Sequence, residues 1–278
     1  MAEASENFKK VFSTFKISVL TLHFLTQRQD FPRRTRRLGL PSSFARKLIT
    51  RLLYFMDKGK LYIVATPIGN LSDFTFRAKE VLENVDLVAC EDTRHTGILL
   101  QHYGIKTAKL SFHSHSGQAK VDKIMAYLED GKDVALVSDA GTPGISDPGY
   151  VLVQAALESG VEVIPIPGAS AVITGLCASG LPTDKFLYLG FLPVKKGRQT
   201  IFKKIAESEH TVVFYESPHR LKKTLQQLNE FVKPETKVTV AKELTKIYET
   251  FYRGTLAEVI KMLPENVKGE YVVMVGGN

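Results

Sequence analysis

Short apolar runs alternate with amphipathic segments along the chain from Lys60 onward. The segments between the runs predict helices over residues 75–84, 96–103, 121–128 and 150–158, of which the last three end at a glycine. The apolar runs predict buried strands over residues 61–65, 86–90, 109–112, 134–137 and 161–165. Near-continuous apolar strands that alternate with helices are typical of a parallel sheet covered on both faces.

A second set of elements follows the Pro167-Gly168 turn. The pattern predicts helices over 199–207 and 218–231, and strands over 186–191, 211–215, 237–240, 248–252 and 271–275. Because only a short loop separates the third and fourth of these strands, we expect a mixed sheet. The sequence therefore predicts an α/β fold with an N-terminal domain over 56–167, a C-terminal domain over 168–278, and a ligand site in the cleft between them.

Residues 1–55 differ from the rest in charge. They carry eleven Lys/Arg and three acids, which accounts for the whole net charge of +8, whereas the remaining 223 residues hold 26 of each sign. Three interpretations of this leader stay open: upstream sequence before a true start at Met56, a basic arm that contacts RNA, or a targeting segment. In the second interpretation the arm is disordered or weakly helical, whereas in the first the leader is not part of the native protein.

The composition is that of an ordinary globular chain, with 44% hydrophobic and 24% charged residues. We expect no membrane-spanning helix, because no run of about 18 apolar residues occurs. The two cysteines, Cys90 and Cys177, cannot form a disulfide scaffold and lie in no zinc-binding spacing, so we expect no structural zinc site and a cytoplasmic location.

Four loops that follow predicted parallel strands carry the candidate chemistry, because ligands bind at the carboxyl ends of such strands. They cover residues 66–70, 91–96, 138–149 and 167–171. The third loop is rich in glycine, alanine and proline, so that a ligand can approach a rigid backbone closely.

Several common motifs are absent. The chain has no GxxxxGK[ST], GxGxxG, GxSxG or HExxH, which excludes a P-loop, a dinucleotide fingerprint, a nucleophile elbow and a zincin site.

Several blocks of sequence together resemble one known family. The blocks are Leu61–Leu71, Glu91–Gly97, Val137–Pro143, Phe214–Arg220, Ala241–Lys246 and Lys268–Glu270. In order and spacing they are similar to the ribosomal RNA small-subunit methyltransferase I family, which belongs to the tetrapyrrole-methylase-like (class III) methyltransferases. The resemblance covers about Lys60 to Gly277 and leaves residues 1–55 outside.

The resemblance implies two α/β domains with S-adenosylmethionine in the cleft, a homodimer, and no metal. It implies methyl transfer to the ribose 2′-OH of a cytidine in the decoding centre of small-subunit (16S) rRNA, either as free rRNA or in the assembled 30S subunit. The residues that would line the cofactor are Pro67, Ser138, Asp139, Ala140, Gly141, Thr142, Pro143, Ile145, Ser146 and Ala169.

A ribose hydroxyl is a weak nucleophile, so a base or a strong polar contact should help remove its proton. The candidate catalytic residues are Glu91, Arg94, Lys242 and Glu243. Asp92 and His95 are further candidates, but Asp92 could instead cap a helix. Arg94 and Arg220 could also simply pair with the acids Glu91 and Asp92.

A basic cluster near the start of the second domain could contact RNA, or could be an ordinary solvated helix face. The candidate RNA-binding residues are Arg94, His95, Lys195, Lys196, Arg198 and Arg220. Two other functions stay open: a class III methylase of a small molecule such as a tetrapyrrole, and a non-catalytic rRNA-binding assembly factor.

Overall fold

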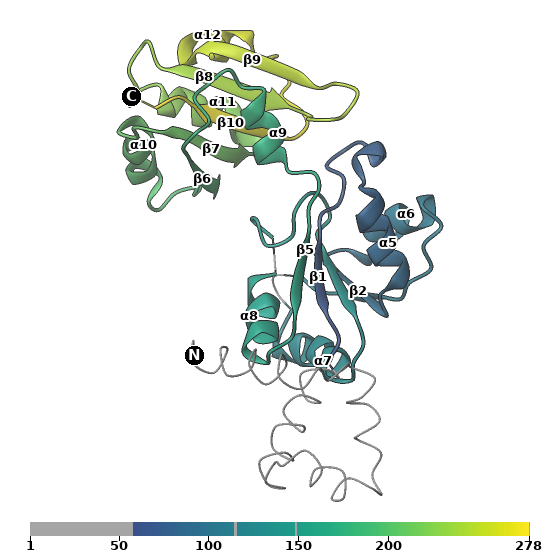
Figure 1. The fold of residues 1–278 in the computed structure, drawn as a ribbon. Helices are drawn as coiled ribbons and strands as arrows, with labels where there is room; N and C mark the ends of the chain where they lie inside the picture. The colour runs from purple at the N-terminus through teal and green to yellow at the C-terminus, as the bar shows by residue number, and fades with distance from the viewer. Residues whose placement is uncertain (1–57, 114–115, 148, 278) are drawn as a thin grey trace, which may run out of the picture. The chain divides into compact units, whose positions relative to one another are not determined.

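A parallel five-stranded sheet forms from the first set of apolar runs, as predicted (Figure 1). The structure, a computed structural model, describes residues 58–113, 116–147 and 149–277, so the leader 1–55 and its possible start at Met56 lie outside the described residues. The sheet order is β3-β2-β4-β1-β5, and every neighbouring pair is parallel. The strands are β1 Leu61–Val64, β2 Leu87–Cys90, β3 Lys109–Ser111, β4 Val134–Val137 and β5 Val163–Ile166.

Helices cover both faces of this sheet. Alternate residues of β4 enter two separate cores: Val134 and Leu136 join one, and Ala135 and Val137 join the other. The first core includes side chains of α7 Gln118–Glu129 and α8 Tyr150–Glu158. The second includes side chains of α5 Phe76–Asn84 and α6 Thr93–His102. Burial on both faces explains why β2 and β4 are apolar at every position.

Helix α6 begins earlier than the apolar pattern predicts. We expected it from residue 96, but it starts at Thr93, because the Asp92 side chain caps it by accepting a hydrogen bond from the backbone N–H of Arg94 at 2.8 Å. The alternative role of Asp92 as a helix cap is thereby confirmed.

The second sheet is mixed, as predicted. Its order is β6-β7-β10-β8-β9; β6 and β7 are parallel, and the other neighbouring pairs are antiparallel. The strands are β6 Phe186–Phe191, β7 Thr211–Glu216, β8 Lys237–Lys242, β9 Thr250–Thr255 and β10 Tyr271–Val275. Helices α10 Arg198–Ala206 and α11 Pro218–Leu228 pack on one face around Phe202, Phe214 and Leu225.

Two short helices escaped the sequence analysis. Helix α12 Leu256–Met262 begins at a capping box between Thr255 and Glu258, and it joins the core of α10 and α11. Helix α9 Ala171–Cys177 packs through Val172 and Leu176 on the other face of the second sheet. Both helices have seven residues, too few for a clear helical period. The division into domains at residue 167 stays a prediction.

No helix within the described ranges combines the length and apolar character needed to cross a membrane.

Candidate functional site

The loops after β1 and β4 are joined to each other at the carboxyl edge of the first sheet. Thr66 and Gly141 exchange two backbone hydrogen bonds, of 2.9 and 3.1 Å, in an isolated bridge. Gly141 has a φ of +88°, a left-handed conformation that favours glycine. The bridge therefore holds the two loops at a fixed spacing.

Buried hydroxyl groups tie these loops further. The Thr66 hydroxyl donates to the carbonyl of Ser138 at 3.1 Å, and the Ser138 hydroxyl donates to the carbonyl of Gly141 at 3.2 Å. The Thr142 hydroxyl donates to the carbonyl of Ala169, in the loop after β5, at 3.2 Å. Three of the four loops that the sequence singled out thus form one hydrogen-bonded frame.

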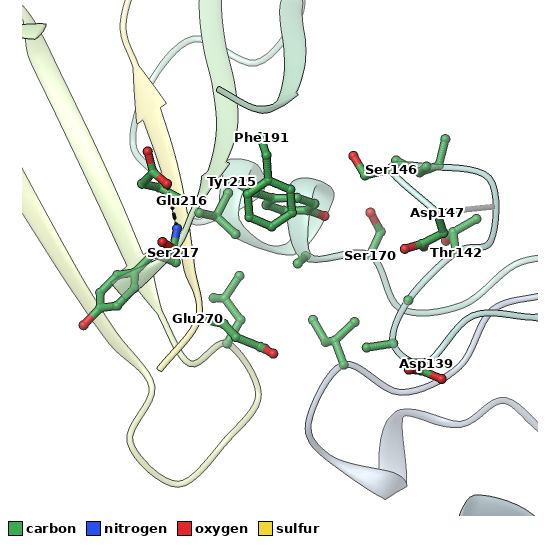
Figure 2. Close-up of a pocket in the computed structure, with 18 of the residues that line it drawn as sticks. Asp139, Thr142, Ser146, Asp147, Ser170, Phe191, Tyr215, Glu216, Ser217 and Glu270 are labelled. Atoms are coloured by element: carbon green, nitrogen blue, oxygen red, sulfur yellow. Dashed lines mark hydrogen bonds between the residues drawn. The ribbon is translucent and has the colours of Figure 1, made fainter. Parts of the chain in front are cut away.

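This frame forms one wall of a cavity of about 380 Å³, and residues of the second sheet form the other wall. Figure 2 shows the two walls: Asp139, Thr142, Ser146, Asp147 and Ser170 lie on one side, and Phe191, Tyr215, Glu216, Ser217 and Glu270 on the other. The remaining lining residues are Ile68, Ala140, Gly141, Ile145, Ala171, Pro218, Leu244, Tyr271 and Val272.

Six of the ten candidate cofactor residues line this cavity: Asp139, Ala140, Gly141, Thr142, Ile145 and Ser146. Pro67 and Ser138 instead line a second, smaller pocket. Pro143 and Ala169 line neither of the two, although Ala169 accepts the hydrogen bond from Thr142 that supports the wall.

Sequence reasoning missed the wall contributed by the second sheet. Tyr215, Glu216 and Ser217 lie in the block 214–220, and Glu270 lies in the block 268–270. Both blocks carried the family resemblance, so the signal was present, but their side chains were not assigned to the ligand site.

A tyrosine hydroxyl connects the long loop after β4 to the second sheet. The hydroxyls of Ser146 and Tyr188 lie 2.6 Å apart, and Ser146 has a left-handed φ of 69°. The Tyr188 ring packs edge-on against Tyr215 at a centroid distance of 5.5 Å, and Phe191 lies 5.4 Å from Tyr215. Burial raises the pKa of the Tyr215 hydroxyl, so this aromatic wall stays neutral.

Three acidic side chains interact at and behind the first wall: Asp139 and Asp147 line the cavity, and Glu91 lines neither pocket. Burial, together with the charges of Glu91 and Asp139, raises the pKa of Asp147 to about 6. Burial and the charge of Asp139 raise the pKa of Glu91, and His113 opposes this effect. The backbone N–H of Asp92 donates to the Asp139 carboxylate at 3.1 Å, which fixes Asp139 next to the loop after β2. This wall suits a ligand with positive charge.

The second pocket has a volume of about 260 Å³ and lies beside the loops after β1, β2 and β4. Asp139 lines both cavities. The other residues of the second pocket are Thr66, Pro67, Gly69, Leu71, His95, Thr96, Ile98, Leu99 and Ser138.

Arg94 projects into solvent at the start of α6 and pairs with Asp92. Its side chain is 90% exposed, and its Nε and Nη2 donate to the two carboxylate oxygens of Asp92 at 3.2 and 2.8 Å. The alternative that Arg94 pairs with a nearby acid is confirmed, although its exposure leaves the guanidinium accessible to other partners.

Arg220 also pairs with a carboxylate, but the partner is Glu216, which the sequence analysis did not consider. The Glu216 carboxylate is fully buried and accepts from Arg220 Nε at 2.8 Å, from the Ser217 N–H at 2.8 Å, and from the Thr224 hydroxyl at 2.6 Å. Arg220 Nη1 donates further to the carbonyl of Leu192 at 3.3 Å.

Arg198 is part of the same network rather than of an exposed basic face. It is 9% exposed, and its guanidinium donates to Gln227, Pro193 and Thr224 at 2.9, 2.9 and 2.6 Å. Arg198 was expected to contact RNA, but it has an internal role instead. Together with Arg220 it connects the segment after β6 to α11 through hydrogen bonds. Lys195 and Lys196 of that segment are exposed and line neither cavity.

Glu243 is held in the loop that follows β8. Its carboxylate accepts from Lys246 Nζ at 3.0 Å and from the Glu270 N–H at 2.9 Å, and its backbone has a φ of 49°. Burial alone would raise the pKa of Glu243, but these hydrogen bonds lower it overall. The lowered pKa and the two hydrogen bonds that Oε1 accepts favour a structural role over that of a proton acceptor. Lys242 is half-buried at the end of β8.

Among the described residues, no group of three or more His, Cys, Asp or Glu side chains is arranged to hold a metal ion.

The sequence and the architecture match a known class of enzymes. Residues 60–260 match the family of tetrapyrrole (corrin/porphyrin) methylases. The uroporphyrin-III C-methyltransferase of Thermus thermophilus shares the fold, with a TM-score of 0.55 and 22% identity over 79% of this chain and 94% of that chain. Cobalt precorrin-4 methyltransferase has a TM-score of 0.54 and 17% identity over 78% and 94% of the two chains. The fold and the family match define a methyltransferase of the tetrapyrrole methylase class.

Relatives of much higher identity narrow this class. Ribosomal RNA small subunit methyltransferase I of Synechocystis sp. is 52% identical over 79% of both chains. The protein of the same name from Escherichia coli O157:H7 is 49% identical over 80% of this chain and 79% of its own. The chain belongs to the ribosomal RNA small subunit methyltransferase I family.

Proposed function

We propose that the protein transfers a methyl group from S-adenosylmethionine to the ribose 2′-OH of a cytidine in the decoding centre of small-subunit (16S) rRNA. The observation that carries this proposal is the identity of about 50% to relatives named for methylation of small-subunit rRNA. The sequence blocks between Leu61 and Glu270 resemble the same family, and that resemblance implies the cytidine 2′-OH as the acceptor. We further propose a homodimer that acts in the cytoplasm on the rRNA or on the assembled 30S subunit.

The cavity residues fit S-adenosylmethionine. A volume of about 380 Å³ lies within the range of small-molecule sites, and Ile68, Phe191 and Leu244 supply apolar surface. Asp139 and Asp147 place negative charge at the wall, which complements a ligand that carries a sulfonium and an ammonium group. When bound, the cofactor supplies a methyl carbon whose bond to sulfur breaks with both electrons retained by sulfur.

The chain's own residues would position the acceptor and take up its proton. Glu91 is the strongest candidate for the base, because burial raises its pKa and because it lies near Asp139 and Asp147 at the cavity wall. Its carboxylate would accept the proton of the 2′-OH as the oxygen–carbon bond forms. Arg94 would contact a phosphate that flanks the acceptor nucleotide, since its planar guanidinium binds two phosphate oxygens at once.

The two alternatives receive less support. The small-molecule methylases that share the fold are at most 22% identical among the structures compared, which supports the fold alone. A non-catalytic assembly factor would have no need for the hydrogen-bonded frame around the cavity.

A map of 2′-O-methylation on small-subunit rRNA, from cells with and without the protein, tests the reaction. We expect one cytidine of the decoding centre to lose its methyl group without the protein and to regain it when purified protein and S-adenosylmethionine are added to unmodified subunits. An unchanged map would contradict the proposal.

Gly141→Val tests the position of the cofactor. The branched side chain would project at the cavity wall, in contact with Ile68, and we expect calorimetry to show at least about a tenfold loss of S-adenosylmethionine affinity. Gly144→Val is the matched control: Gly144 lies in the same loop with a similar φ of +84°, but outside the cavity lining and with open space for a Cβ. Equal affinities in the two variants would place the cofactor elsewhere.

A further inference from the structure

We propose that the second pocket receives the acceptor nucleotide of the RNA, while the larger cavity holds the methyl donor. This inference rests on the proposed function, because it assigns the place of the RNA in the same reaction. Apart from Asp139, none of the residues that line the second pocket lines the donor cavity.

The two cavities share their walls. In the loop after β1, Ile68 lines the larger cavity, whereas its neighbours Pro67 and Gly69 line the second pocket. In the loop after β4, Ser138 lines the second pocket, Gly141 lines the larger cavity, and Asp139 lines both. A methyl group can pass between bound molecules only where their sites adjoin, and these sites adjoin at Asp139.

The second pocket has the size and surface for one unstacked nucleotide. Its volume of about 260 Å³ is smaller than a typical drug-sized site. Ile98 is 65% exposed at its wall, although the buried face of α6 consists of Thr96, Leu99 and Leu100. The exposed His95 ring lines the same pocket. Enzymes that modify nucleotides take the target base out of its stack and cover it with such apolar and ring surfaces.

A cationic group lies beside this pocket, where the sugar–phosphate backbone of an entering nucleotide would run. Arg94 directly precedes the lining residue His95 and is 90% exposed. Contacts of this kind position a nucleic acid without reading its sequence.

The carboxylates at the junction face the acceptor hydroxyl in this arrangement. The hydrogen bond from the Asp92 N–H to Asp139 connects the loop that carries Glu91 to the residue shared by both cavities. A hydroxyl presented from the second pocket at Asp139 would therefore lie near the loop of Glu91. The proton moves from the 2′-oxygen to the Glu91 carboxylate as the new oxygen–carbon bond forms and the donor's carbon–sulfur bond breaks.

Ile98→Glu is the test variant. Its carboxylate would put negative charge where the base and the phosphates enter, at a position exposed enough for the fold to tolerate it. We expect the KM for small subunits to rise at least about tenfold, which corresponds to the loss of one base-packing contact, with S-adenosylmethionine affinity unchanged within about twofold.

Met262→Glu is the matched control, because Met262 is an exposed apolar residue, 51% accessible, at the end of α12 and lines neither cavity. We expect this variant to match the wild type in both measurements. As an independent measurement, we expect a photoreactive base at the target position to crosslink to the peptide that contains residues 93–102 of α6.

The outcomes separate this inference from the proposed function. If the wild type leaves rRNA unmethylated, both are overturned. If the wild type methylates rRNA while Ile98→Glu retains the wild-type KM, or if the crosslink lies on the second sheet, only the assignment of the second pocket is overturned.

Discussion

Two arginine–carboxylate pairs, at the starts of α6 and α11, have the same chemistry in opposite surroundings. Each arginine follows a strand and an acidic residue, and each was a candidate for contact with RNA. The Arg94 side chain is 90% exposed and that of Asp92 is 34% exposed. In the second pair these values are 26% for Arg220 and 0% for Glu216.

The difference in burial separates their roles. A solvent-exposed ion pair contributes little to stability, so Arg94 can leave Asp92 for a phosphate at small cost. A buried carboxylate must keep all its partners, and Glu216 has partners from a serine N–H, a threonine hydroxyl and a guanidinium. The first pair is therefore available for binding, and the second fixes one wall of the cavity.

The largest expected effect comes from removing the buried charge. Glu216→Gln would leave Arg220, and the buried Arg198 nearby, without their counter-charge. We expect the free energy of unfolding to fall by about 3 kcal/mol, the low end for breaking a buried pair, since Arg220 is partly exposed. Urea denaturation monitored by circular dichroism measures this change. A loss below about 1 kcal/mol would show that the network is not what stabilises the wall.

Removing the exposed guanidinium should affect catalysis instead. Arg94→Ala should fold with wild-type stability and bind S-adenosylmethionine normally, yet lose methyl transfer by about a hundredfold, because one charged contact to the bound RNA is gone. Arg94→Lys should restore only part of the rate, since an ammonium lacks the planar fork. Single-turnover methylation of small subunits is the measurement. Near wild-type rates in Arg94→Ala would show that Arg94 has only a structural role at the start of α6. Lys242 would then be the next candidate for the catalytic contact.

Glu91 lies in the loop after β2, beside the exposed pair, and forms an ion pair with neither Arg94 nor Arg220 in the structure. Its raised pKa predicts how the rate of methyl transfer depends on pH. Burial and Asp139 raise the pKa of Glu91, and a base works only when ionised. The rate should therefore rise with pH through that raised pKa and level off above it, at a pH higher than the usual glutamate value of about 4.3. Glu91→Gln should lower the rate about a hundredfold, and its rate should no longer rise with pH over this range. If the rate of Glu91→Gln still rises with pH as in the wild type, Glu91 is not the base.

Much of the fold could be predicted because strong local signals specified it. Apolar runs and helix-ending glycines located the first sheet, and the loop lengths indicated that the second sheet is mixed. The failures have local causes: α6 starts at Thr93 because the Asp92 cap overrides the apolar period, and α9 is too short to show one.

The candidate site was predictable only on the side where parallel strands end together. The loop that carries Asp139 and Ser146 could be placed there because it must open at the carboxyl edge of the sheet, and the family resemblance then indicated these two residues. Arg198 could not be placed, because a basic run does not reveal that one of its members turns inward to Gln227 and Thr224. Only tertiary packing decides which arginine of a basic segment is buried.

The smallest expected effect concerns Asp92, which both caps α6 and neutralises Arg94. Hydrogen bonds from Arg94 lower the pKa of the Asp92 carboxyl, so the pair is fully charged at neutral pH. Asp92→Asn keeps an oxygen that can cap the helix equally well but removes the charge that competes with phosphate for Arg94. We expect unchanged stability and about a two- to threefold lower Kd for small-subunit rRNA at low ionic strength, a gain that added salt should reduce.

Titration of labelled rRNA measures this Kd, and the double variant with Arg94→Ala should show no gain in affinity. Weaker RNA binding in Asp92→Asn would mean that Asp92 orients the guanidinium, so that the exposed pair binds as a unit rather than by exchange of partners.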